Sequence, residues 1–189
     1  PVLVVSATFS GCDVEQITVD LGANAFLGAP FHPAVFRAHV CALLAGETPR
    51  QAPTVLVVDD SPTMLSLLKQ ALNAHGYVVH SAADGQEARR VFHRVYPDVA
   101  VLDFHLPDLT GDRLLAEFKR PEYQTAVIMI TTDPTPDLAT TLMRQGADAY
   151  VRKPFDPAYL IDLCEKVRRE RALLRVEALL EARTRQLRE

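Results

Sequence analysis

The sequence predicts an α/β fold, a doubly wound parallel sheet of five strands, over residues 54–168. Short apolar runs rich in Val, Ile and Leu alternate there with segments whose apolar residues recur at helical spacing. The runs contain few polar residues, which is typical of parallel strands that are buried on both faces. Five such alternations predict a single sheet that is covered by helices on both sides.

The elements follow from local signals along the chain. The first strand is predicted at residues 55–58, and Ser61-Pro62 suits the helix start that follows, because proline is tolerated in the first turn. This helix is predicted to reach about Ala74 and to stop at Gly76. The remaining strands are expected at 78–79, 99–102, 126–130 and 149–152, and the remaining helices at about 85–95, around 114–118, at about 136–145 and from about 156 onward.

Polar residues stand at the ends of four of these strands: Asp59, Asp60, Asp103, Thr131 and Lys153. Ligand sites of open parallel sheets lie beyond the carboxyl ends of the strands, so we expect these residues to converge. Clustered carboxylates repel one another unless a cation joins them, and a hard oxygen site with few protein ligands suits Mg²⁺. A carboxylate can also act as a nucleophile and form an aspartyl-phosphate. The set therefore predicts phosphoryl transfer, without the GxxxxGK[ST] signature of a P-loop.

Four motifs carry a resemblance to a known family: VLVVDDS (55–61), VLDFHLPDLTGDRLL (101–115), VIMITTD (127–133) and GADAYVRKPF (146–155). In this order and spacing, residues 53–168 resemble the receiver domain of two-component response regulators. The resemblance implies the flavodoxin-like receiver fold. It also implies a partner, a histidine kinase or a phosphotransfer protein, whose phosphohistidine donates the phosphoryl group.

The resemblance implies a metal site around the phosphoacceptor, which is Asp103. The implied Mg²⁺ ligands are Asp60, Asp103 and the backbone carbonyl of His105. Asp59 is implied to assist, through a water molecule.

Three further residues are implied to bind and report the phosphoryl group. Thr131 and Lys153 would contact it, and the rotamer of Tyr150 would follow Thr131 when the domain switches. A receiver catalyses its own phosphorylation and dephosphorylation, so whether to class it as an enzyme is uncertain, and we expect no turnover of an independent substrate.

An internal repeat covers the first part of the chain. PVLVVSA (1–7) resembles AVIMITT (126–132), and LGANAFLGAPF (21–31) resembles QGADAYVRKPF (145–155), at a nearly constant offset. Residues 1–46 are therefore interpreted as the C-terminal half of a second, degenerate receiver, and residues 47–53 as a linker.

Two substitutions distinguish this first copy from the complete receiver at 54–168. Ser6 stands where Thr131 does, and Ala29 stands where Lys153 does. Loss of the ammonium group predicts that the first copy is not phosphorylated. An unrelated αβ segment is the alternative interpretation.

Residues 169–189 lack glycine and proline and consist mostly of helix formers. Apolar residues at three- and four-residue spacing predict a coiled-coil-like continuation of the last receiver helix; they are Leu173, Val176, Leu180 and Leu187. A frayed surface helix is the alternative. Residues 180–189 resemble the signalling helices that precede histidine kinase or diguanylate cyclase outputs. We therefore expect a switch within a longer tandem-receiver protein.

Composition limits the partners and the location. A net charge of −4 argues against a nucleic-acid-binding surface, and no apolar run approaches the roughly 18 residues that span a bilayer. The cysteines Cys12, Cys41 and Cys164 are widely spaced, which disfavours a disulfide framework and fits a reducing cytoplasm. We expect a cytoplasmic protein that binds neither nucleic acid nor membrane.

We also expect a homodimer. It would form through the face of the fourth helix, fifth strand and fifth helix, or through the C-terminal helix.

Two other functions stay open. One is a pseudo-receiver scaffold that acts by binding other proteins. The other is a Mg²⁺-dependent phosphatase that forms an aspartyl-phosphate at Asp103. Such phosphatases usually carry a second aspartate two residues after the nucleophile as a general acid, and His105 stands at that position.

Overall fold

The computed structural model describes residues 1–7, 18, 22–29, 31, 33–46, 52–120, 123, 125–133 and 135–186. The chain forms two compact units, Pro1–Ala52 and Pro53–Glu189, and each contains its own sheet. Among the residues described, no helix combines the length and the apolar character that crossing a lipid bilayer requires.

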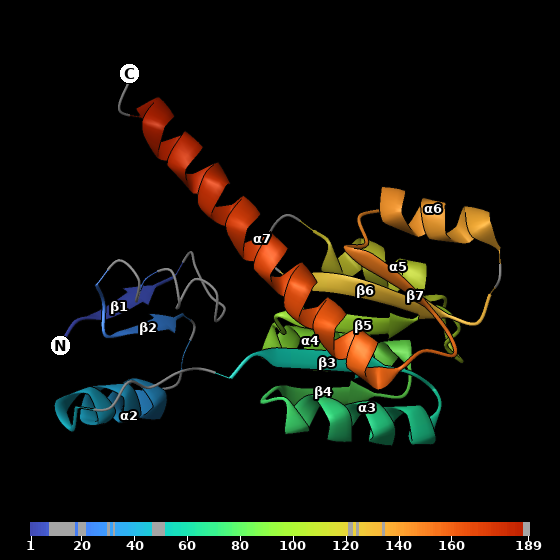
Figure 1. The fold of residues 1–189 in the computed structure, drawn as a ribbon, viewed down its shortest axis with the longest axis horizontal. Coiled ribbons are helices and arrows are strands. Elements are labelled where there is room, and N and C mark those ends of the chain that lie inside the picture. Colours follow the sequence, from blue (N-terminus) through green and yellow to red (C-terminus); the bar gives the residue numbers. More distant parts are fainter. Residues whose placement is uncertain are drawn as a thin grey trace. The chain divides into compact units, whose positions relative to one another are not determined.

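The larger unit contains a five-stranded parallel sheet with the order β4-β3-β5-β6-β7 (Figure 1). The predicted α/β class and doubly wound five-stranded sheet are confirmed. The chain runs outward from β3 to β4 and then crosses back to β5, so the strand order reverses between β3 and β5. Such a reversal opens a crevice at the carboxyl ends of the two strands. The strands are β3 (Thr54–Val58), β4 (Val78–Ala82), β5 (Val99–Asp103), β6 (Ala126–Thr131) and β7 (Ala149–Arg152).

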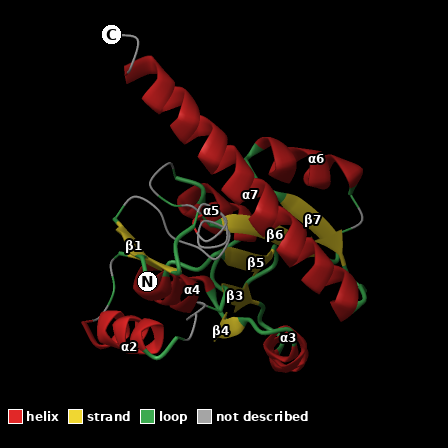
Figure 2. Ribbon diagram, turned by 60° about the vertical axis from the view of Figure 1, so that its left-hand side comes forward, coloured by secondary structure: helices red, strands yellow, loops and turns green. Residues whose placement is uncertain are grey.

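Helices cover both faces of this sheet (Figure 2). On one face, α3 (Pro62–Ala74) and α7 (Pro157–Gln186) bury residues such as Leu68 and Leu160. On the other face lie α4 (Gly85–Val95), α5 (Gly111–Phe118) and α6 (Pro136–Arg144). There Phe92 of α4 stacks on Phe118 of α5, with ring centroids 3.7 Å apart. Burial on both faces explains why the strands are apolar throughout.

Two of the helices, α3 and α4, begin at side chains that accept a free N–H group of the first turn. The Ser61 hydroxyl oxygen caps α3. The next residue is Pro62, which has no N–H that would need an acceptor. The Asp84 carboxylate caps α4 by accepting the Glu87 N–H at 2.7 Å. The predicted starts of both helices agree with these caps.

α7 continues well beyond the sheet that its first half covers (Figure 1). Among the side chains of α7 that the structure describes, Val167 is the last buried apolar one, and the helix itself ends at Gln186. One turn beyond Val167, the Arg171 guanidinium donates to one oxygen of Asp148 at 2.8 Å. Lys119, at the end of α5, contacts the other oxygen of Asp148 at 2.5 Å. The pair with Arg171 fastens α7 to Asp148, the residue that directly precedes β7, and the pair with Lys119 ties the same carboxylate to the end of α5.

Of the helical continuation predicted over residues 169–189, the part up to Gln186 is helical, and residues 187–189 lie outside the described part of the chain. Leu173 is 60% exposed and Leu174 is 63% exposed. The side chains at the other three predicted coiled-coil positions, Val176, Leu180 and Leu187, lie outside the described part of the chain, so the coiled coil stays a prediction.

The smaller unit contains a parallel pair of strands and a helix: β1 (Leu3–Ser6), β2 (Ala25–Gly28) and α2 (Pro33–Leu44). The order strand, strand, helix agrees with the sequence repeat. The helix expected between the two strands falls on residues 8–21, which lie outside the described part except for residue 18. Most of the predicted linker at 47–53 lies outside it too.

The hydrogen bonds at the start of β1 repeat those at the start of β6. Asn24 donates its N–H to the Val2 carbonyl at 2.8 Å and accepts the Val2 N–H on its side chain at 2.6 Å. Asp148 does the same with Val127, at 2.8 and 2.7 Å.

The ends of the same two strand pairs also correspond. The Ala29 N–H donates to the Ser6 carbonyl at 2.7 Å, just as the Lys153 N–H donates to the Thr131 carbonyl at 2.8 Å. The backbone thus pairs the same four positions that the sequence repeat aligned.

Candidate functional site

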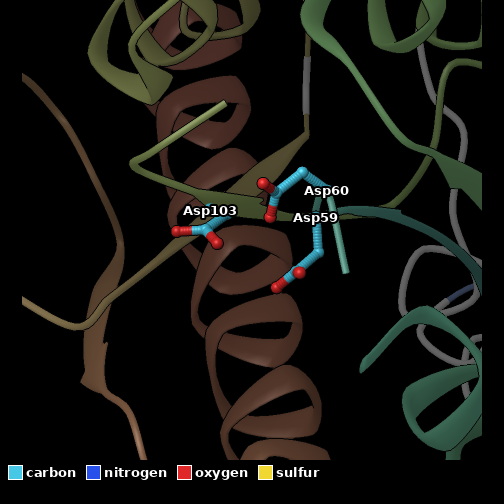
Figure 3. Close-up of side chains that lie close together, drawn as sticks. All are labelled: Asp59, Asp60 and Asp103. Carbon is cyan, nitrogen blue, oxygen red and sulfur yellow. The ribbon is translucent and has the colours of Figure 1, made fainter. Parts of the chain in front are cut away.

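Three carboxylates gather at the carboxyl ends of β3 and β5 (Figure 3). Asp59 and Asp60 directly follow β3, and Asp103 is the last residue of β5. One oxygen from each carboxylate lies within 4.8 Å of the others. Asp59 and Asp103 are buried while Asp60 is exposed, so solvent reaches the cluster from the side of Asp60.

Lys153 joins two of these acids. Its Nζ lies 2.6 Å from Asp59 Oδ2 and 2.5 Å from Asp103 Oδ2, and its side chain is only 14% exposed. The residue directly follows β7, which brings it to the same edge of the sheet. Burial by itself lowers the pKa of Lys153, but the hydrogen bonds and charges of Asp103 and Asp59 together raise it above its usual value. The lysine therefore stays charged and offsets part of the charge of the acids.

Thr131 and Tyr150 contact a neighbouring loop. Thr131 is fully buried at the end of β6, and its Oγ1 accepts the Asp133 N–H at 3.0 Å. The Tyr150 hydroxyl donates to the Asp133 carbonyl at 3.3 Å. Both side chains thus hold the same residue at the start of the loop between β6 and α6.

The loop after β5 folds back tightly over Asp103. The His105 N–H donates to Asp103 Oδ1 at 3.2 Å, and the Gly111 N–H donates to the Phe104 carbonyl at 2.8 Å. A Cβ on Gly111 would lie 2.4 Å from the Asp103 carbonyl oxygen, closer than any side chain tolerates. Glycine is therefore required for α5 to begin so close to the phosphoacceptor candidate.

The chemistry of this donor set fits a hard divalent cation. Three carboxylates within 4.8 Å present more negative charge than one lysine offsets, and all donors are oxygens. Mg²⁺ takes a few carboxylates and keeps several waters, and the exposed Asp60 leaves the cluster open to solvent. Across the residues that the structure describes, no other group of three His, Cys, Asp or Glu side chains gathers in this way.

The structure brings four predicted site residues into one cluster: Asp59, Asp60, Asp103 and Lys153. Thr131 and Tyr150 lie on the adjoining strands β6 and β7 in their own hydrogen-bonded group. Strand-end reasoning missed Asp133, because it lies inside a loop. The Thr-x-Asp spacing, common in short side-chain-to-backbone turns, is the one local signal for it.

Comparison with known proteins identifies the same region. A family model described as response regulator receiver domain matches residues 55–165. The transcriptional regulatory protein TrcR of Mycobacterium tuberculosis is 40% identical over 127 residues, covering 67% of this chain and 47% of that protein. The regulatory protein AtoC of Escherichia coli is 34% identical over 102 residues, covering 54% of this chain and 22% of that protein. The chain spans about half the length, or less, of these two curated relatives.

Solved structures show the same likeness. A response regulator receiver domain protein from Clostridium thermocellum superposes with a TM-score of 0.61 at 31% identity, covering 65% of this chain and 98% of that one. The chemotaxis response regulator CheY4 of Vibrio cholerae superposes with a TM-score of 0.58 at 30% identity, covering 62% of this chain and 99% of that one.

Proposed function

Because this chain belongs to the response regulator receiver domain family, we propose that its larger unit accepts a phosphoryl group on Asp103. The donor would be a phosphohistidine of a histidine kinase or a phosphotransfer protein, the partners with which receivers interact. The observation that carries the proposal is the placement of the Asp103 carboxylate, within reach of two further acids and an ammonium group.

In the proposed step, a carboxylate oxygen of Asp103 attacks the phosphorus of the phosphohistidine. The new O–P bond forms as the P–N bond breaks, and the imidazole leaves with the electron pair. Lys153 turns from Asp103 to an oxygen of the incoming group, where its charge stabilises the transferred phosphoryl group. Water later attacks the same phosphorus and regenerates the free carboxylate with inorganic phosphate.

Asp60, Asp103 and the backbone carbonyl of His105 would hold Mg²⁺, and Asp59 would assist through water. When bound, the ion neutralises charge on the phosphoryl oxygens during transfer. The short reach between Asp59, Asp60 and Asp103 supports this assignment.

Phosphorylation would also change the Thr131 group. A phosphoryl oxygen on Asp103 attracts the Thr131 hydroxyl, which would then turn away from the Asp133 N–H. The loop held by Asp133 loses one of its two anchors, and Tyr150, bonded to the same residue, repacks. A pre-existing equilibrium between two arrangements would shift as a result.

The test is phosphorylation of the full chain by acetyl phosphate and Mg²⁺, followed by intact-mass measurement. We expect the native chain to gain one phosphoryl group and Asp103→Asn to gain none. The matched control is Asp137→Asn, which removes an exposed acid in the first turn of α6 and should be phosphorylated like the native chain. An inert native chain, or equal phosphorylation of Asp103→Asn, would contradict the proposal.

For residues 1–46 we propose a half receiver that is not phosphorylated. The support is the correspondence of hydrogen bonds between β1–β2 and β6–β7, together with Ala29 in the position of Lys153. This unit is also where a scaffold function, acting by protein binding, would reside. Intact-mass measurement of Asp103→Asn tests this proposal. A phosphoryl group found on that variant would have to lie on a residue other than Asp103.

The output of the switch would run through α7 to a segment such as a histidine kinase or a diguanylate cyclase. A homodimer, formed through the α6–β7–α7 face or through the end of α7, would carry the signal, and the exposed Leu173 supports this assembly. A cytoplasmic location is part of the same proposal and is supported by free Cys41 and Cys164. Turnover of a generic phosphomonoester would instead support the phosphatase function.

A further inference from the structure

Asp108 links the loop after the phosphoacceptor to a helix that comes earlier in the chain. Its two carboxylate oxygens accept the backbone N–H groups of Gly85 at 2.8 Å and of Gln86 at 3.0 Å. These donors belong to the first turn of α4, where N–H groups have no partner within the helix. The Gly85 bond also holds the pKa of Asp108 below its usual value, so the carboxylate is charged at neutral pH.

Leu109 makes the same connection through apolar contact. A Cβ on Gly85 would lie 2.4 Å from Leu109 Cδ2, so the leucine side chain occupies the space that the glycine leaves open. Leu109 also packs against the apolar cluster to which the buried residues of α4 and α5 belong. Asp108 and Leu109 therefore hold the middle of the loop against α4 by one polar and one apolar contact.

This loop carries the main chain that lies against the site. It leaves β5 at Asp103, and an antiparallel bridge between His105 and Thr110 closes it. The His105 N–H donates to the Asp103 carboxylate. β5 and α5 fix the two ends of the loop. Asp108 lies three residues after His105, and its hydrogen bonds to α4 fix the middle of the loop.

We propose that Asp108 is a positioning residue for the metal end of the site: by capping α4, it fixes the loop whose His105 backbone faces Asp103. The inference rests on the proposed function, since the ligand that the loop serves is the Mg²⁺ proposed there. Asp108 touches neither metal nor phosphate and acts through the loop.

The matched control comes from the same helix. Asp84 also caps α4, with Oδ1 accepting the Glu87 N–H, but it precedes α4 and is not part of the loop. Asp108→Ala and Asp84→Ala each remove one cap from one helix end, so both should lower the melting temperature. Only Asp108→Ala should change the site.

The experiment is calorimetric titration of the full chain with Mg²⁺, well below the melting temperature of each variant. We expect the Kd for Mg²⁺ to rise by about tenfold in Asp108→Ala, as for other residues that orient metal ligands, and to stay at the native value in Asp84→Ala. Asp108→Asn keeps one acceptor oxygen for two N–H donors, so its Kd should lie between the native and alanine values. If Asp108→Ala does not fold, the Kd of Asp108→Asn for Mg²⁺ tests the inference in its place.

Equal Kd values for the Asp108 variants and the native chain would overturn the inference, and so would equal changes in Asp108→Ala and Asp84→Ala. Failure of the proposed function looks different. In that case the native chain itself binds no Mg²⁺ and is not phosphorylated by acetyl phosphate.

Discussion

Lys153 replaces a metal cation in one respect, because it holds Asp59 and Asp103 together at short distance. The two acids are almost completely buried, and a buried charge without a partner is costly. In the proposed function, the same ammonium group would move toward a phosphoryl oxygen on Asp103. A single side chain would then both stabilise the unmodified fold and respond to the modification.

Lys153→Gln should make stability depend on Mg²⁺ more strongly than in the native chain. Without the ammonium group, Asp59 and Asp103 repel each other, and we expect the free energy of unfolding to fall by about 3 kcal/mol in the absence of metal. Saturating Mg²⁺ should restore most of it, since a ligand that binds the native state stabilises it. Urea unfolding with and without Mg²⁺ measures both values.

Lys166→Gln is the control for this change. Lys166 is on α7, its side chain is 68% exposed, and its ion pair with Glu170 is within the helix. Its removal should alter stability by less than about 1 kcal/mol, with or without metal. Equal losses for the two lysine variants would refute the role given to Lys153.

At the level of single elements, the strands were the easiest part to predict. Runs such as Val99–Leu102 are apolar on both faces, and the structure buries every residue of β5. The predicted start of β4 at Val78-Val79 is confirmed, but the apolar pattern does not define its end, because His80 and Ser81 interrupt it. β4 lies at the sheet edge and pairs only with β3, so polar residues are tolerated up to Ala82.

The contacts between elements were not predictable in the same way. Asp108 bonds to α4 across 23 residues, and Arg171 bonds to Asp148 across 23 residues, with no periodic pattern that joins them. Strand-end acids could be found because the topology of a parallel sheet places them. A loop carboxylate that caps a different helix depends on loop geometry, which composition and spacing do not determine.

α7 gives a prediction at this scale. Arg171→Gln removes one of the two cations on Asp148, so the part of α7 beyond Val167 should be held less firmly. We expect faster amide hydrogen exchange over residues 171–186 and a loss of about 1 kcal/mol in stability, the upper end for a partly exposed pair. Hydrogen exchange with mass spectrometry measures the first, and urea unfolding the second.

The control variant changes Arg169, which lies two residues before Arg171 on α7. Arg169 pairs with Glu165, one turn earlier in the same helix, and its side chain is 64% exposed. Arg169→Gln should leave exchange beyond Val167 as in the native chain. The anchoring role of Arg171 is wrong if both variants accelerate exchange to the same extent.

For the molecule as a whole, the proposed homodimer depends on the helical continuation. Leu173 belongs to the predicted coiled-coil series and Leu174 does not, although both are similarly exposed. Leu173→Glu should convert a dimer into a monomer, because it places a charge in the seam between two helices. Light scattering coupled to size-exclusion chromatography measures the mass of each species.

Leu174→Glu is the matched control, since it adds the same charge one position away and outside the seam. We expect it to remain dimeric. A monomeric native chain, or equal dissociation of the two variants, would show that the dimer does not form through this part of α7.

The ion pair between Lys153 and Asp59 joins residues that are 94 positions apart in the chain, and the pair with Asp103 spans 50. Non-local contacts of this kind form late, because a large loop must close before they contribute. A partly folded intermediate that has made β3 and β5 but not β7 lacks the ammonium group. If Asp103 accepts phosphate as proposed, its phosphorylation would require that the whole sheet has formed.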